Sequence, residues 1–217
     1  MENINYILYI CITLPLLLSL FVINGRSRAV ISGLIIGSTV AILVSEINSA
    51  ILQASEFDYL RVTINATPVT EELIKALPVL YFAMVISDER RTLLQFSFAI
   101  GLGFAILENS VVLVQSIDSV TILWAFSRGI GASLMHGLCT TCVGVGVSYV
   151  KKRRKLFTPG TIALLLTAMT YHSTFNVLVQ SGYKYYGVFL PLVTYIPIVY
   201  AYINRINNNK KKLKEKA

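Results

Sequence analysis

Long apolar runs separated by short polar connectors make up almost the whole chain. Seven runs of about 20 residues or more are continuously apolar. They cover residues 4–23, 29–54, 62–86, 92–116, 120–150, 158–180 and 186–203. A helix of about 20 residues crosses the roughly 30 Å hydrocarbon core of a bilayer. Continuous hydrophobicity also favours helices over the alternating strands of a barrel. The pattern therefore predicts an all-α polytopic membrane protein with about seven transmembrane helices.

The connectors alternate in charge. Every second connector is rich in lysine and arginine, and together these segments hold 15 of the 19 basic residues. They are residues 24–28, 87–91, 151–157 and 204–217. The connectors on the opposite side hold only Arg61 and Lys184. The positive-inside rule therefore predicts an N-terminus outside the cell and a C-terminus in the cytoplasm. An odd number of spans agrees with this orientation.

Composition supports a membrane setting. The chain is 55% hydrophobic and only 14% charged, with a mean hydropathy of +0.66, whereas soluble domains average about 25% charged residues. The net charge of +8 does not indicate nucleic-acid binding, because the basic residues lie in connectors. No repeat or linker divides the sequence, so we expect one integral-membrane domain over residues 1–217. Its basic cytoplasmic tail, 203–217, would be solvated or lie against anionic lipid.

Polar and charged residues inside the apolar runs are the candidates for function. A charge at mid-bilayer costs roughly 2.5–3.5 kcal/mol, so such residues are retained mainly where they pair or do chemistry. The set comprises Glu71, Glu72, Lys75, Glu108, Asn109, Arg128, His136, His172 and Asn176. At 1.5 Å per residue, most of the charged members lie roughly 12–17 Å below the outer surface. His136 is the exception, because it lies deeper along the long fifth run. We expect these side chains to meet in the outer half of the membrane.

Spacing within the runs supports that convergence. Lys75 lies three residues after Glu72 and four after Glu71, so it can neutralise a carboxylate on a shared helix face. His172 and Asn176 are four residues apart, which directs an imidazole and an amide into the same space.

Four motifs carry a family resemblance. They are Glu71-Glu72-Leu-Ile-Lys75, Gly103-Phe-Ala-Ile-Leu-Glu108-Asn109, the segment from Arg128 to His136-Gly137, and His172-Ser-Thr-Phe-Asn176. Together they resemble the PrsW family of intramembrane proteases and, more distantly, the CAAX-protease and bacteriocin-processing superfamily. Phe104-x-x-x-Glu108 stands where the wider superfamily has histidine, which favours PrsW. The chain resembles a divergent member of that family, since it has Asn176 where aspartate is expected and lacks an acidic, proline-containing segment after the first run.

The resemblance implies proteolysis within or just outside the membrane. Membrane-anchored regulators such as anti-sigma factors, or other single-span proteins, are the implied substrates. The implied location is the plasma membrane of a prokaryote.

The residue types are compatible with peptide hydrolysis, which needs a base, an oxyanion donor and an acid. Either Glu71 or Glu72 could act as the base. His136 and His172 would polarise the water, and Glu108 belongs to the same catalytic group. Asn176 and Asn109 are candidate oxyanion donors. Lys75 and Arg128 are interpreted as charge partners.

The charge balance of these residues bears on whether the site holds a metal ion. Three glutamates against Lys75 and Arg128 leave one net negative charge, or two if Glu46 joins the cluster. One zinc ion bound by His136, His172 and Glu108 would fit that deficit and the usual catalytic ligand set. Protonation of one histidine and one glutamate would fit it equally, giving a metal-free glutamate protease. The superfamily resemblance favours the metal-free form.

Two other functional classes compete with a protease. A proton- or solute-coupled transporter would also place Glu, Lys, Arg and His in the membrane. That class predicts broken helices and inverted repeats, and Pro68 is the one sequence feature that suggests a broken helix. A non-catalytic membrane scaffold would leave the shared depth of the polar residues unexplained.

Overall fold

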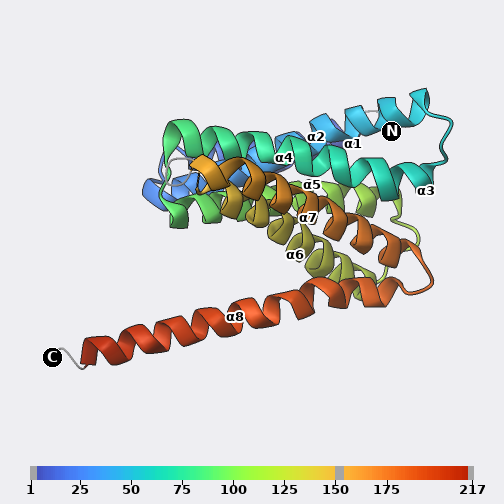
Figure 1. The fold of residues 1–217 in the computed structure, drawn as a ribbon. Helices are drawn as coiled ribbons and strands as arrows, with labels where there is room; N and C mark the ends of the chain where they lie inside the picture. Colours follow the sequence, from blue (N-terminus) through green and yellow to red (C-terminus); the bar gives the residue numbers. More distant parts are fainter. Residues whose placement is uncertain (1–3, 150–153, 215–217) are drawn as a thin grey trace.

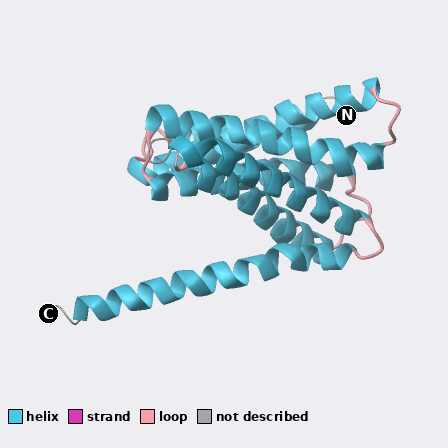
Figure 2. Ribbon diagram, viewed as in Figure 1, coloured by secondary structure: helices cyan, strands magenta, loops and turns pink. Residues whose placement is uncertain are grey.

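The computed structural model describes residues 4–149 and 154–214, and every element within them is helical (Figures 1 and 2). In chain order the elements are α1 (Ile4–Ser19), α2 (Gly25–Ala54), α3 (Tyr59–Arg61), η1 (Val62–Ala66), α4 (Thr67–Tyr81), η2 (Phe82–Ile86), α5 (Arg90–Gln115), α6 (Ile122–Val147), α7 (Arg154–Gln180) and α8 (Lys184–Lys214). The all-α prediction is confirmed for this part of the chain.

Seven rod-like stretches correspond to the seven apolar runs. The third stretch is continuous from Tyr59 to Ile86, but its backbone twice adopts π-helical geometry, in η1 and η2. Among the described residues, four helices are long and apolar enough to cross a membrane, namely α2, α5, α6 and the part of α7 from Phe157 to Gln180. Helix α1 and residues 186–201 of α8 are apolar but shorter. The predicted count of seven fits the fold, and the predicted orientation stays a prediction.

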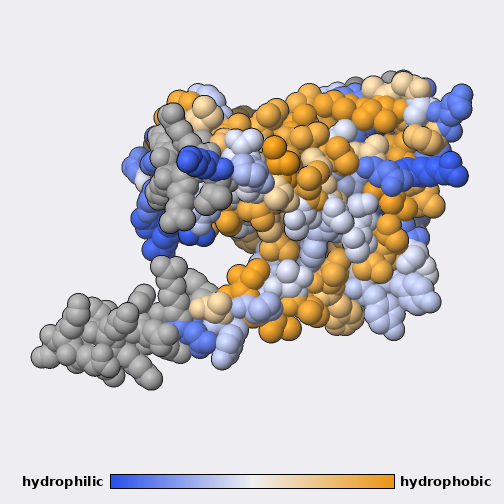
Figure 3. Space-filling view, viewed as in Figure 1, coloured by the Kyte–Doolittle hydropathy of each residue, from blue (hydrophilic) through white to orange (hydrophobic). Residues whose placement is uncertain are grey.

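The connectors gather at two opposite ends of the bundle (Figure 1). At one end Arg26 Nη2 lies 2.6 Å from Glu89 Oε1, which joins the first turn of α2 to the connector before α5. Arg90 lies 5.8 Å from the ring of Tyr149, just after α6, so that connector is at the same end. A hydrogen bond from Thr92, together with Arg26, lowers the pKa of the exposed Glu89. Apolar residues dominate the visible middle of the molecule, and strongly hydrophilic residues lie at its ends (Figure 3).

Small residues allow α5 to approach α2 and α6 closely. A Cβ atom on Gly103 would overlap the carbonyl oxygen of Leu34, and one on Gly37 would overlap that of Ile100. Ser38 Oγ donates to the carbonyl oxygen of Gly103 at 2.9 Å across the α2–α5 interface. On the other side of α5, a Cβ on Gly101 would overlap the carbonyl of His136 in α6. Burying apolar surface between helices gains little in a membrane, because the lipid tails are equally apolar. Transmembrane helices therefore associate largely through close packing of this kind.

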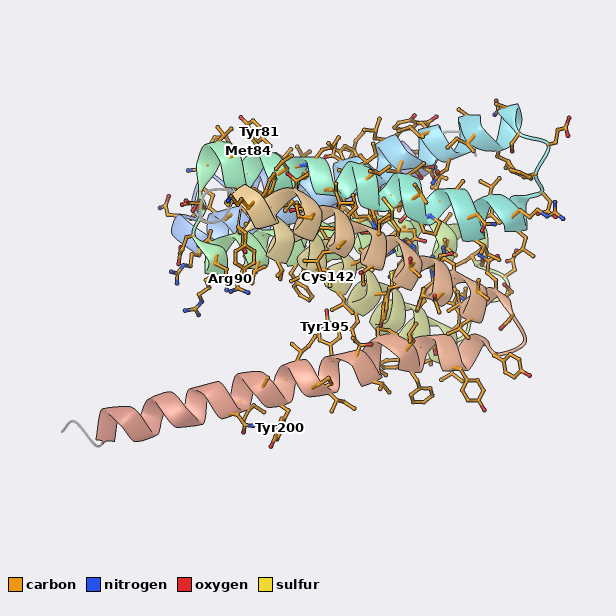
Figure 4. The ribbon with its side chains drawn as sticks, in the orientation of Figure 1. Tyr81, Met84, Arg90, Cys142, Tyr195 and Tyr200 are labelled. Carbon is orange, nitrogen blue, oxygen red and sulfur yellow. The ribbon has the colours of Figure 1, made fainter. Side chains whose placement is uncertain are left out.

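Helix α8 packs on α6 and α7 through its first half and then diverges from the bundle (Figure 1). Tyr195 points from α8 toward α6 (Figure 4), and its hydroxyl donates to the carbonyl of Leu134 at 3.3 Å. On the opposite side of the molecule, Tyr81 and Met84 point away from the bundle (Figure 4), as expected of lipid-facing side chains. The core of the fold is thus the group α2, α4, α5, α6 and α7.

The orientation can be tested with single cysteines. We expect Glu56→Cys to react with an impermeant thiol reagent in intact cells, because the connector before α3 is predicted to face outward. Arg91→Cys should react only after the cells are permeabilised. The background chain would carry alanine at Cys11, Cys139 and Cys142. Labelling of Arg91→Cys in intact cells, with protection of Glu56→Cys, would reverse the predicted topology.

The close packing of α2 on α5 predicts a sharp difference between two glycine substitutions. Gly103→Ala should destabilise the fold by about 1–3 kcal/mol, because the new methyl group meets backbone that has little room to move. Gly129→Ala is the matched control, since a Cβ there has nothing within 4 Å. Thermal unfolding in detergent would measure both. Equal stability of the two variants would contradict the interpretation of Gly103 as a packing residue.

Candidate active site

Four helices bring the charged residues together. Glu71, Glu72 and Lys75 come from α4, Glu108 from α5, Arg128 and His136 from α6, and His172 from α7. The structure therefore brings these charged side chains together, while their level in the outer half of the membrane stays a prediction. Glu108 links the deeper His136 to the rest of the group. The two carboxylate oxygens of Glu108 bind Arg128 and His136, which lie about two turns apart on α6. Arg128 Nη2 lies 2.8 Å from Oε1, and His136 Nε2 lies 2.8 Å from Oε2.

The ammonium group of Lys75 lies at the centre of this group. Its Nζ is 2.8 Å from Glu72 Oε1, 3.3 Å from Glu71 Oε2 and 2.9 Å from His136 Nδ1. It also lies 3.9 Å from the centroid of the Phe104 ring, a favourable cation–π distance. Lys75 and Glu72 are 0% exposed. A buried ammonium is tolerated only when its charge and its three N–H donors are satisfied, and here three acceptors are supplied.

Hydrogen bonding determines the proton positions on both imidazoles. An ammonium can only donate, so His136 Nδ1 must accept from Lys75, and its hydrogen is on Nε2, which donates to Glu108. His172 Nδ1 lies 3.0 Å from Glu72 Oε1, an oxygen that can only accept while the carboxylate is ionised. His172 therefore carries its hydrogen on Nδ1, which leaves Nε2 as an acceptor in the neutral ring. The two rings meet edge to face, with centroids 4.9 Å apart.

A cavity of about 830 Å³ reaches this cluster from the end of the bundle opposite the Arg26–Glu89 pair. Tyr59, Ser119 and Gln180, at or next to the connectors of that end, line it together with polar residues of α2 such as Asn48. At its deep end the lining residues are Glu71, Glu108, Arg128, His136, His172 and Asn176. Glu72, Lys75 and Asn109 are not among the described lining residues. The adjacent glutamates thus differ, because Glu71 faces the cavity and Glu72 faces Lys75 and His172.

The π-helical turn η1 precedes the glutamates and is tied to α7. Pro68 has no N–H, so the carbonyl of Ile64, four residues earlier, lacks its usual helical partner. The N–H of Thr67 bonds to Val62, which leaves the carbonyl of Thr63 free as well. Two side chains of α7 donate to these carbonyls, Ser173 Oγ to Ile64 at 2.6 Å and Asn176 Nδ2 to Thr63 at 3.0 Å. A π-turn is often found at a functional site, and this one is held against the helix that carries His172.

Two predicted oxyanion donors are placed differently from each other. Asn176 lines the cavity, but one of its amide hydrogens is bound to Thr63, so we interpret it first as a structural residue. Asn109 Oδ1 is buried without a hydrogen-bond partner among the described residues. Glu46 does not join the cluster, because it accepts a hydrogen bond from Tyr6 at 2.8 Å. The count of one net negative charge therefore applies, for three glutamates and two cations with neutral histidines.

Some site residues were not found from the sequence. Phe104 entered the sequence analysis only as part of a family motif, with no role of its own, yet its ring covers the ammonium of Lys75. Ser173 was not singled out, although it sits inside the His172-x-x-x-Asn176 motif. Pro68 was the available signal for both α7 contacts, because a proline in a helix frees a carbonyl that some neighbour must satisfy.

Comparison with known families agrees with this geometry. A sequence model described as PrsW family intramembrane metalloprotease matches residues 26–202. The chain belongs to the PrsW family. No curated protein and no solved structure shows significant similarity to it. As a PrsW protein with several long apolar helices, it is an integral membrane protein and a membrane peptidase.

The family description names a metalloprotease, and the donor atoms of the cluster bear on that description. Glu71, Glu72, His136 and His172 each offer a ligand atom, and these atoms lie within 4.8 Å of one another. Two imidazoles and two carboxylates are suitable donors for zinc, so the donor set fits. Glu108, predicted as a ligand, is not in this four-residue group. It accepts from the far nitrogen of His136 instead, as carboxylates behind metal-binding histidines do.

The hydrogen bonds between α7 and η1 predict a test of Asn176. Asn176→Ala should lower stability by about 1–3 kcal/mol, because the carbonyl of Thr63 loses its donor inside the bundle. Ser173→Ala should act similarly through Ile64. Thr174→Ala is the control, since that exposed hydroxyl donates within its own helix, to the carbonyl of Thr170, and has no other partner among the described residues. Unfolding and peptidase rate should be measured together. Unchanged stability with a lower rate would favour the oxyanion role predicted from the sequence.

Proposed function

We propose that this PrsW protein is an intramembrane endopeptidase that cleaves membrane-anchored proteins in the outer half of the membrane. The observation that carries the proposal is the cavity that runs from one end of the bundle to Glu71, His136 and His172. A hydrolase inside a membrane needs such a path, because water and an unwound peptide must reach the reacting groups. Family membership favours this function over a transporter or a scaffold.

We infer that Glu71, rather than Glu72, is the general base. Glu71 lines the cavity, and its distance to Lys75 is the longer one, at 3.3 Å. Glu72 is fully buried and engaged by both Lys75 and His172. A base must touch the water that it deprotonates. Glu72 therefore positions Lys75 and the ring of His172, while Glu71 takes a proton from water as the hydroxide attacks the peptide carbonyl.

The other cavity residues supply the remaining functions. Arg128 is the cationic residue that both lines the cavity and has a donor, Nε, without a partner among the described residues. It is suited to stabilise the oxyanion of the tetrahedral intermediate. His172 Nε2 is an acceptor in the cavity wall and can orient the attacking water. The proton taken by Glu71 then passes to the leaving amine, which balances the reaction without a further acid.

If a zinc ion binds, Glu71, Glu72, His136 and His172 are the residues that would hold it. It would supply Lewis-acid activation of water. The positioning of His136 by Glu108 is a property of this chain's own side chains in either case.

The partners follow from the family and the charge pattern. We propose single-span proteins, such as an anti-sigma factor, as substrates, and the plasma membrane of a prokaryote as the location. With basic connectors in the cytoplasm, the cavity opens to the outer side. Cleavage would then occur near the outer end of the substrate's membrane segment.

Glutamine substitutions distinguish the two glutamates. Glu71→Gln should lower the cleavage rate by roughly 10²–10⁴-fold, the usual contribution of a general base, while the fold survives. Glu72→Gln should mainly destabilise the protein, by about 3–5 kcal/mol at most, because buried Lys75 loses its nearest counter-charge. Purified protein and fluorescent single-span peptides in detergent would give the rates, and thermal unfolding the stabilities.

Detection of peptide fragments is itself the first test of the function. Thr174→Ala, which removes an exposed hydroxyl, should keep its activity and serves as the control. Wild-type rates in Glu71→Gln, Glu72→Gln and His172→Ala together would show that this cluster performs no hydrolysis.

A further inference from the structure

The Lys75 ammonium is held as a bound cation would be. Three acceptors from three residues surround it at 2.8–3.3 Å, and the Phe104 ring covers it at 3.9 Å. These three acceptors use all of the N–H donors of an ammonium group. Lys75 is 0% exposed, so protein atoms rather than solvent surround its ammonium group.

The same residues form the candidate metal group. Of Glu71, Glu72, His136 and His172, the first three contact the Lys75 ammonium directly. A metal ion needs the lone pairs that these residues now direct at Nζ. It would also bring two positive charges next to a third in a region of low dielectric, where repulsion is strong. An ion and the ammonium therefore compete for one position.

We propose that Lys75 is the resident cation of this site, and that a divalent ion occupies the Glu71–Glu72–His136–His172 group only when the ammonium is displaced. The proposal concerns the site on which the proposed function rests. Its test measures ion binding rather than proteolysis, so either proposal can fail while the other stands.

Arg128 provides a matched control. Arg128 is the second cation of the cluster, and it binds Glu108 on the far side of His136. Among the described residues, Arg128 forms no ion pair with any of the four donor residues. Lys75→Met and Arg128→Met each remove one positive charge and keep an unbranched chain. Only Lys75→Met empties the position between the donors.

Cobalt and zinc titrations of purified protein in detergent measure the effect. We expect Lys75→Met to bind Zn²⁺ at least about 100-fold more tightly than wild type, because each 1.4 kcal/mol of relieved repulsion is tenfold in affinity. Its Co²⁺ form should show the visible absorption of a low-coordinate site. Arg128→Met should gain less than about tenfold. Adding His172→Ala to Lys75→Met should abolish the gain, which assigns the ion to this group.

Two further measurements test the proposal if Lys75→Met does not fold. Lys75→Gln retains a hydrogen-bond donor for Glu72 and should show the same direction of change. Wild type and His172→Ala should contain equal zinc by elemental analysis after exposure to the ion. One zinc per wild-type chain that His172→Ala lacks would overturn the proposal, as would equal gains in Lys75→Met and Arg128→Met.

Discussion

The structure depends on satisfying one buried ammonium group. Lys75 on α4 binds two carboxylates of its own helix and the imidazole of His136 on α6. His136 in turn donates a hydrogen bond to Glu108 on α5, and Glu72 accepts one from His172 on α7. Because an unpaired charge in this setting would be far more costly than a local packing defect, the network determines how four helices meet. The apolar surfaces of these helices would allow many other arrangements.

Close helix packing makes that network geometrically possible. Hydrogen bonds of 2.8–3.0 Å between side chains of different helices require short distances between the helix axes. Glycines at 101 and 103 let the backbone of α5 approach α6 and α2 without a side chain between them. Gly101 lies against the backbone of His136 itself, so the residue that allows the approach is next to the residue that uses it. Small residues and buried charges therefore act together in joining these helices in lipid.

The irregular turn η1 connects backbone structure to chemistry. A regular helix from Tyr59 to Ile86 would satisfy its own carbonyls and would offer α7 nothing to bind. Pro68 and the π-turn free two carbonyls, and α7 supplies Ser173 and Asn176 to meet them. This interaction fixes the level of α7 against α4 within one turn of His172, so the imidazole meets Glu72 rather than lipid. A backbone irregularity that ends at Ala66, five residues before Glu71, thus positions a side chain on another helix.

The sequence by itself determined the helices and the list of polar residues. Continuous apolar runs require helices, because each backbone polar group must be satisfied inside its own segment when no water is present. The rarity of Glu, Lys, Arg and His in such runs marked Glu71, Glu72, Lys75, Glu108 and both histidines as a group. Only the tertiary structure decided which members of the group line the cavity and which bind one another. Adjacent residues on a helix point in different directions, and the neighbours of α4, not its own sequence, determine which direction leads to the cavity. For the same reason, Glu71 and not Glu72 lines the cavity, Asn176 binds a carbonyl, and Lys75 rather than open space lies between the donors.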